Sequence, residues 1–173
     1  MTGKTFLNNL ANGKVDIVQL FLEQLEELQM NYCVIGGLAV NAYADPVASL
    51  DLDIVLAIEN IEKLVEHAGK IFSVEKFPHR INLLHSGSDL RIQLQTDSRY
   101  QSFIDNAVTK KVLGYEMKVA ALEDVLKGKI WAYSNVERRK SKRQKDLADI
   151  MRLVETHPHL YDLLPQEIKT IVD

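Results

Sequence analysis

The segment 32–56, with the sequence YCVIGGLAVNAYADPVASLDLDIVL, constrains the fold and chemistry of this chain more than any other. An apolar stretch ends in the glycine pair Gly36 and Gly37, and after 13 further residues a second apolar stretch carries Asp51 and Asp53. Side chains alternate along a strand, so the two carboxylates lie on one face with their Cα atoms about 6–7 Å apart. Such a pair can bind one or two Mg²⁺ ions, because hard divalent cations prefer oxygen ligands.

The glycine pair adds a second kind of chemistry. Without a Cβ, Gly36 and Gly37 allow the backbone to approach a phosphate closely, and the N–H groups at the start of a helix attract anions. Carboxylates beside a phosphate cradle are typical of nucleotidyl or phosphoryl transfer. A simpler interpretation stays open, in which two exposed aspartates lie at a sheet edge and the glycine pair serves only a tight turn.

This arrangement resembles the signature of the DNA polymerase beta-like nucleotidyltransferase superfamily. That signature has an apolar residue, Gly, Gly or Ser, about a dozen residues, and then Asp, an apolar residue and Asp or Glu. Ile35 fills its first position, and Ser49 stands where many members have a small hydroxyl residue. The resemblance implies an α/β (α+β) nucleotidyltransferase fold, with a mixed sheet flanked by helices. It also implies that the glycine pair and Ser49 bind the nucleotide, and that Asp51 and Asp53 are catalytic ligands of Mg²⁺ or Mn²⁺.

A third acid usually comes from a neighbouring strand in this superfamily, and two residues here compete for its position. The predicted strand 89–95 alternates polar with apolar residues. If Gln93 lies level with the two aspartates, the third acid is missing, and Asp89 lies about 13 Å further along, too far to share a metal ion. If Asp89 lies level with them, it completes a catalytic triad of acids. Placement in the middle of the strand favours Gln93.

The hydrophobic pattern predicts strands first and helices after them. We expect a nucleotidyltransferase α/β core over residues 1–119 and C-terminal helices over residues 120–173 that pack on this core. Helices are predicted at 15–30, 37–43, 60–70, 99–108, 121–133, 136–155 and from 165 to the end; strands are predicted at 32–35, 52–56, 80–85, 90–95 and 114–119.

The C-terminal half resembles the abortive-infection (AbiEii-type) toxin nucleotidyltransferases. Lys129 lies on one predicted helix, and the next helix carries Arg143, Lys145 and Asp146 on neighbouring helical positions. With the glycine pair and the two aspartates, this resemblance spans most of residues 30–155. It implies that Lys129, Arg143 and Lys145 approach the nucleotide triphosphate or the acceptor. It further implies that Asp146 is a supporting or catalytic acid in the nucleotide site.

Composition restricts the partners and the compartment. The net charge is −3, so the molecule as a whole is not built to bind nucleic acid. Segment 137–145 is an exception, with six bases and one acid, and is either a patch for an anionic acceptor such as RNA or an exposed helix face. The single cysteine, Cys33, excludes an internal disulfide and favours the cytoplasm. No signal peptide or membrane-spanning run is evident, so we expect no membrane partner.

These observations favour a Mg²⁺-dependent nucleotidyltransferase that moves an NMP group from an NTP to an acceptor. The acceptor hydroxyl would belong to a tRNA, a protein or a small molecule. The AbiEii-type resemblance implies a role in a toxin–antitoxin or phage-defence pair, with an antitoxin as partner. If Gln93 replaces the third acid, the alternative is a nucleotide-binding protein with impaired transfer. A third interpretation is a module on the same fold that docks on another protein.

Overall fold

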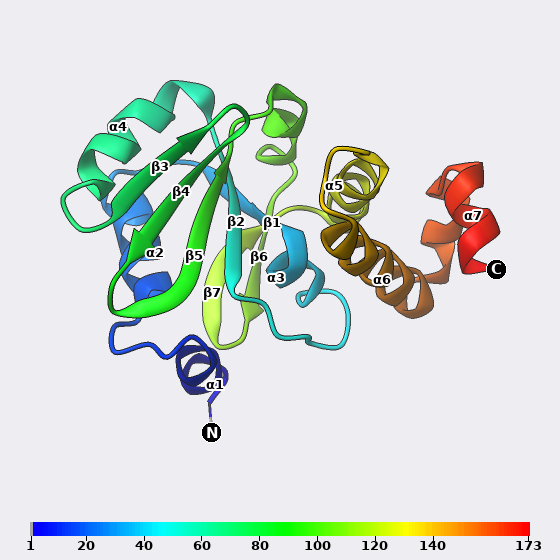
Figure 1. The fold of residues 1–173 in the computed structure, drawn as a ribbon, viewed down its shortest axis with the longest axis horizontal. Coiled ribbons are helices and arrows are strands. Elements are labelled where there is room, and N and C mark those ends of the chain that lie inside the picture. Colours follow the sequence, from blue (N-terminus) through cyan, green and yellow to red (C-terminus); the bar gives the residue numbers. More distant parts are fainter. Residues whose placement is uncertain (1) are drawn as a thin grey trace.

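The strand that precedes the glycine pair and the strand that carries the two aspartates lie side by side at the centre of a mixed sheet. The computed structural model describes residues 2–173. The strands are β1 (Tyr32–Ile35), β2 (Asp51–Leu56), β3 (Ser73–Phe77), β4 (Arg80–His85), β5 (Ser88–Gln95), β6 (Val108–Val112) and β7 (Tyr115–Val119). Within the described residues they form a seven-stranded sheet in the order β3-β4-β5-β2-β1-β7-β6 (Figure 1). β2 therefore lies between β1 and β5, which places its aspartates next to both neighbouring strands.

Helices lie behind the sheet and beside it. The helices are α1 (Gly3–Leu10), α2 (Ile17–Glu27), α3 (Gly36–Val40), α4 (Ile58–Ala68), α5 (Leu122–Ser134), α6 (Lys140–Thr156) and α7 (Gln166–Val172), with 3-10 turns η1 (Ser98–Phe103) and η2 (Pro158–Leu163). α2 and α4 contact each other on one face of the sheet, whereas α5 and α6 pack together next to α3, at the right of Figure 1. The other face of the sheet meets this helical pair, and the candidate site lies between them.

Alternation along β5 fixes which side chains reach that face. Leu90, Ile92 and Leu94 are buried on the helix-covered side. The intervening residues, Arg91 and Gln93, are only partly buried and point the other way. A one-residue slip of the strand would expose all three apolar side chains, so burial holds β5 in this register.

The apolar packing is continuous between the sheet and the C-terminal helices. Leu147, Ile150 and Leu153 of α6 belong to the same buried cluster as Leu38 of α3 and Leu52 of β2. Burial of such side chains stabilises the folded state by roughly 1.5–3 kcal/mol each, which ties the helices firmly to the core. No helix within residues 2–173 has the length and apolarity needed to cross a membrane.

The sequence predictions missed four elements: α1, β3, β6 and the 3-10 turn η2. β3 and β6 are the two edge strands of the sheet. Their sequences, SVEKF and VTKKV, are mostly exposed and carry charges, which is a common protection of sheet edges. Because neither strand has a fully buried face, neither shows the alternation that identified the central strands.

Candidate functional site

The glycine turn begins directly beside the second aspartate. β1 and β2 are antiparallel, and their register pairs Ile35 with Asp53. Gly36 has a φ of 73°, in the left-handed region that favours glycine. A Cβ at Gly36 would also overlap the Asp53 carboxylate. Conformation and space therefore both require glycine here, and they keep this face of Asp53 open.

Substituting the two glycines separately tests this requirement. We expect Gly36→Ala to lower the free energy of unfolding by more than about 2 kcal/mol, because it combines left-handed strain with a clash. A Cβ at Gly37 would lie 3.5 Å from Ser49 Oγ, which is ordinary contact distance. Gly37→Ala should therefore change the stability by less than about 1 kcal/mol. Urea denaturation of both variants measures the difference, and equal losses would contradict this account of Gly36.

Ser49 lies beside the glycine pair and organises the start of β2. Its hydroxyl accepts a hydrogen bond from the Asp51 N–H and donates one to the Asp51 carbonyl, both at 3.3 Å. Ser49, Gly36 and Gly37 are therefore brought together with the aspartates, as the sequence resemblance implied.

The strand register identifies the neighbour of the aspartates as Gln93. β2 and β5 are parallel, and Asp51 pairs with Arg91 while Asp53 pairs with Gln93. Asp89 lies before the residues of β5 that pair with β2. It is exposed and accepts a hydrogen bond from Asn12 Nδ2 at 2.7 Å. The alternative with Asp89 level with the pair is corrected by this register, because buried residues on the other face of β5 prevent the necessary slip.

Gln93 contacts both of its charged neighbours. The amide orientation is assigned from its hydrogen bonds: Nε2 donates to Asp53 Oδ1 at 2.8 Å, and Oε1 accepts from Arg91 Nε at 3.2 Å. A carboxylate could only accept, so the donor half of this bridge requires an amide.

Two cations contact Asp51. Arg91 Nε donates to Asp51 Oδ1 at 3.1 Å, and Lys142 Nζ of α6 lies 3.5 Å from Asp51 Oδ2. Arg91 was not predicted as a site residue, and Lys142 was only one of the bases of segment 137–145. The pairing of β2 with β5 would have identified Arg91. No local sequence pattern, however, indicates the contact of Lys142 with Asp51, because these two residues are 91 positions apart in the chain.

Asp53 is the aspartate whose ionisation is disfavoured. Burial, and then the charge of Asp51, raise the pKa of Asp53 to about 6, although Lys129, Arg138 and Lys142 act in the opposite direction. An additional cation next to the two carboxylates would relieve their repulsion. This is the electrostatic setting in which a metal ion binds favourably.

The raised pKa of Asp53 predicts a pH-dependent stability for the metal-free protein. The ordinary pKa of Asp is 3.8 and the folded value is about 6, so the folded state binds the proton more tightly. Stability should therefore fall as the pH rises from about 4 to 6, by about 1–2 kcal/mol after allowance for solvent screening. Asp53→Asn should remove this component. Thermal unfolding in EDTA across this range measures it, with Asp89→Asn as a control that should retain the wild-type slope.

The donor set fits one divalent cation bound jointly with substrate. Within residues 2–173 no group of three or more His, Cys, Asp or Glu side chains could hold a metal ion. Mg²⁺, however, is usually bound through one or two carboxylates together with substrate phosphates and waters. Asp51 and Asp53 supply those carboxylates, and the glycine turn leaves space beside Asp53.

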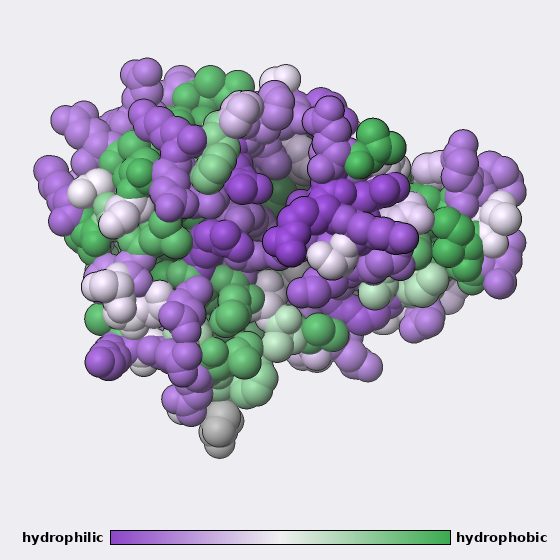
Figure 2. Space-filling model, viewed as in Figure 1, coloured by the Kyte–Doolittle hydropathy of each residue, from purple (hydrophilic) through white to green (hydrophobic). Residues whose placement is uncertain are grey.

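A cleft of about 430 Å³ opens beside Asp53. Its sheet side includes Gln93 and Gln95, and its helix side includes Lys129 and Arg138. Figure 2 shows strongly hydrophilic residues gathered where the sheet faces α5 and α6. The lining also includes aromatic and basic residues: Phe77, His79, Arg80 and Tyr100.

Lys129 is buried and paired rather than free to approach a phosphate. Its Nζ lies 3.1 Å from Asp146 Oδ1 and 2.8 Å from Asp149 Oδ2. Arg138 Nε donates to the other oxygen of Asp146 at 2.7 Å. Burial lowers the pKa of Lys129, but the charges of Asp149 and Asp146 outweigh it and raise the pKa, so the amine stays charged. Asp146 therefore holds two cations at the wall of the cleft.

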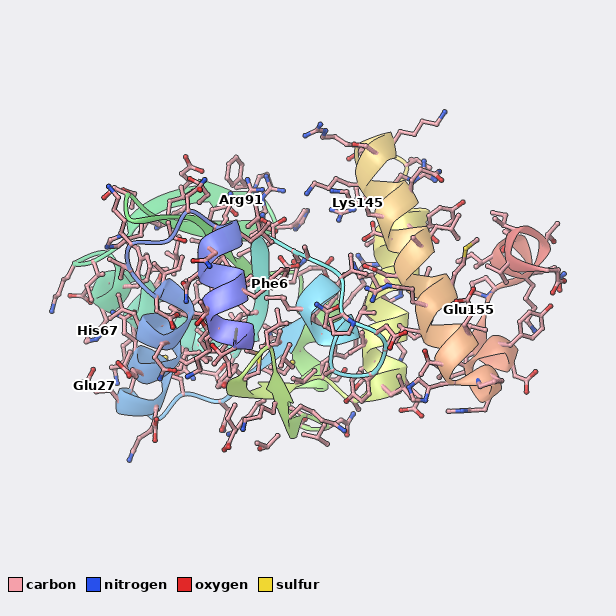
Figure 3. The ribbon with its side chains drawn as sticks, turned by 90° about the horizontal axis from the view of Figure 1, so that it is seen from below. Phe6, Glu27, His67, Arg91, Lys145 and Glu155 are labelled. Atoms are coloured by element: carbon pink, nitrogen blue, oxygen red, sulfur yellow. The ribbon has the colours of Figure 1, made fainter. Side chains whose placement is uncertain are left out.

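Arg143 and Lys145 are not brought to the cleft. Arg143 Nε donates to the Tyr133 carbonyl at 2.7 Å, which anchors α6 to the end of α5. Lys145 is exposed. Figure 3 shows Lys145 on the same side of the molecule as Arg91 but on a separate element. Helical spacing had grouped these residues with Asp146, but α6 turns Asp146 inward and Lys145 outward.

The fold of this chain is similar to that of nucleotidyltransferases of known structure. The lincomycin-bound lincosamide antibiotic adenylyltransferase LnuA is similar in structure, with a TM-score of 0.57 and 12% identity over 82% of this chain and 98% of that chain. ANT(2")-Ia with adenylyl-2"-tobramycin has a TM-score of 0.58 and 15% identity over 90% and 92% of the chains. An antigenic nucleotidyltransferase-like protein from Paracoccidioides brasiliensis has a TM-score of 0.56 and 19% identity over 95% and 84%.

Comparison of sequences adds no closer relative. No family model and no curated protein matches the chain. The structural likeness shows the nucleotidyltransferase fold, while the polymerase beta-like and AbiEii-type resemblances both stay predictions.

Proposed function

We propose that this protein is a nucleotidyltransferase that moves an NMP group from an NTP to an acceptor. The observation that carries the proposal is the placement of Asp51 and Asp53 on one strand face, against a turn where only glycine fits at position 36. The cleft beside them is large enough for a small ligand. The printed names of two proteins with this fold, an adenylyltransferase and an adenylyl-tobramycin complex, support the same reaction class.

The residues of the site have separate roles in this proposal. Asp51 and Asp53 would hold Mg²⁺ or Mn²⁺, which supplies charge neutralisation for the triphosphate as pyrophosphate leaves. The N–H groups of the Gly36–Gly37 turn would hold phosphate oxygens, and Ser49 fixes the backbone at the start of β2 beside that turn. Arg138 lines the cleft and, held by Asp146, would contact the nucleotide. Catalysis would then rest mainly on positioning and electrostatics.

A second candidate function is nucleotide binding without efficient transfer. The amide of Gln93 at the third-acid position favours it, because a neutral amide cannot accept a proton from an acceptor hydroxyl. Pyrophosphate release under conditions where the nucleotide is shown to bind separates the two candidates. Binding with no turnover for any acceptor would support the second.

Thermal stability with ligands tests both candidates. Each of the four NTPs is added with and without Mg²⁺ or Mn²⁺, to wild type and to the Asp51→Asn/Asp53→Asn double variant. A nucleotide at 100 times its Kd should stabilise the protein by about 2.7 kcal/mol. A metal-dependent shift that disappears in the double variant supports the proposed site. No shift with any nucleotide would contradict it and favour a protein-interaction module.

The acceptor and the biological role are proposed from the AbiEii-type resemblance. The AbiEii-type resemblance supports a toxin of a toxin–antitoxin or phage-defence pair, whose acceptor would be a tRNA, a protein or a small molecule and whose partner would be an antitoxin protein. Expression of the wild type should then arrest growth, and the double aspartate variant should not. Equal growth with both would contradict the toxin role without affecting the proposed chemistry.

A further inference from the structure

The acidic centre of the site already holds two fixed cations. Arg91 comes from β5 and Lys142 from the first turn of α6, and both contact Asp51. The Arg91 and Asp51 side chains are 38% and 22% exposed, so this pair is partly shielded from solvent. Two positive side chains therefore contact the Asp51 carboxylate before any metal ion is bound.

Gln93 holds the guanidinium in that place. Its Oε1 accepts from Arg91 Nε at 3.2 Å while its Nε2 donates to Asp53 Oδ1 at 2.8 Å. The same Nε of Arg91 donates to Asp51 Oδ1 at 3.1 Å. Arg91 is thus fixed between the first aspartate and the residue at the third-acid position.

We propose that the Arg91 guanidinium, held by Gln93 and Asp51, takes the place of a second metal ion, so that this site binds one divalent cation. The inference rests on the proposed function and specifies how its metal site is filled. In sites with two metal ions, the ions lie about 3.5–4 Å apart. Such a site needs enough carboxylates to coordinate both ions. Here the pairing of β2 with β5 places no third carboxylate beside Asp51 and Asp53. Asp89 lies outside the paired residues and accepts a hydrogen bond from Asn12.

Counting bound Mn²⁺ tests the proposal without an acceptor or a nucleotide. Free Mn²⁺ is measured by electron paramagnetic resonance during titration of the intact protein. We expect one site per chain in the wild type and none in Asp51→Asn/Asp53→Asn. Two sites in the wild type, both lost in the double variant, would overturn the single-ion inference while leaving the proposed function standing. No binding in the wild type would overturn the inference of one site formed by the protein alone, and would leave the proposed function, in which substrate phosphates share the ion, standing.

Two variants then test whether the position of an added carboxylate matters, or only its charge. Gln93→Glu adds a carboxylate level with Asp53 and should create a second Mn²⁺ site or tighten the first at least about tenfold. Gln95→Glu adds the same charge two residues along the same strand face, also lining the cleft, and should leave the number of sites unchanged. Equal effects of the two glutamates would overturn the proposal.

Arg91→Met keeps the test valid if the Gln93 variant does not fold. Removing the guanidinium frees Asp51 Oδ1 without adding a charge, and Mn²⁺ binding should tighten about tenfold or gain a second site. Circular dichroism first confirms that each variant is folded. Unchanged number and affinity of sites in folded Arg91→Met would overturn the assignment of Arg91.

Discussion

Replacing Asp51 and Asp53 together by Asn lowers nucleotidyl transfer by at least about 10³-fold, the scale of losing a central electrostatic contact to the transition state. The physical reason is that the two carboxylates, which we propose as the metal ligands, lie together on this strand face, while the residue beside them is the neutral Gln93. The measurement is pyrophosphate release with each NTP, once an acceptor supports turnover by the wild type.

The matched control for this experiment is Asp89→Asn. Asp89 is an aspartate on the neighbouring strand, but it is exposed and bonded to Asn12. It should keep wild-type activity. A loss comparable to that of the double variant would mean that Asp89 takes part in catalysis and that the strand register is not the one described above.

Lys129→Met should lower the free energy of unfolding by about 3–5 kcal/mol, because it leaves buried carboxylates without their shared partner. Lys129 and Asp146 are 10% and 2% exposed, so water cannot replace the lost ion pairs. Arg138 would still contact Asp146, and Arg152 would still contact Asp149 at 2.7 Å, which keeps the loss within this range. Urea denaturation followed by circular dichroism gives the difference.

Lys127→Met is the control on the same helix. Lys127 is 55% exposed and lies 4.0 Å from Asp124, at the limit of an ion pair. Its loss should cost less than about 0.5 kcal/mol. If Lys129→Met proved equally mild, the network with Asp146 and Asp149 would not stabilise the fold, and a role of Lys129 toward the nucleotide would gain support.

The central part of the fold followed from the sequence because burial imposes strong patterns there. The alternation of β2 and β5 and the glycine pair before α3 predicted the strands, the turn and the shared face of Asp51 and Asp53. The edge strands β3 and β6 escaped prediction because most of their side chains are exposed and they show no regular alternation. Prediction was therefore most successful where side chains are constrained by packing.

The rest of the site depends on contacts that no local pattern encodes. Choosing between Gln93 and Asp89 required the pairing of β2 with β5, which is a long-range property. Lys129 and Arg143 matched a motif, yet their partners Asp149 and the Tyr133 carbonyl are set by how α5 packs on α6. A basic residue found by motif alone can thus serve the fold instead of a ligand.

The contact between Lys142 and Asp51 joins α6 to the sheet, at 3.5 Å. A cation that binds Asp51 Oδ2 must compete with this amine. A partner that holds the first turn of α6 away from the sheet should therefore strengthen cation binding at Asp51. Because such coupling is reciprocal, cation binding at Asp51 should also release this part of α6 from the sheet. The affinity of the acidic centre would consequently be adjustable from the outer surface of the molecule, through a helix that contributes no carboxylate to it.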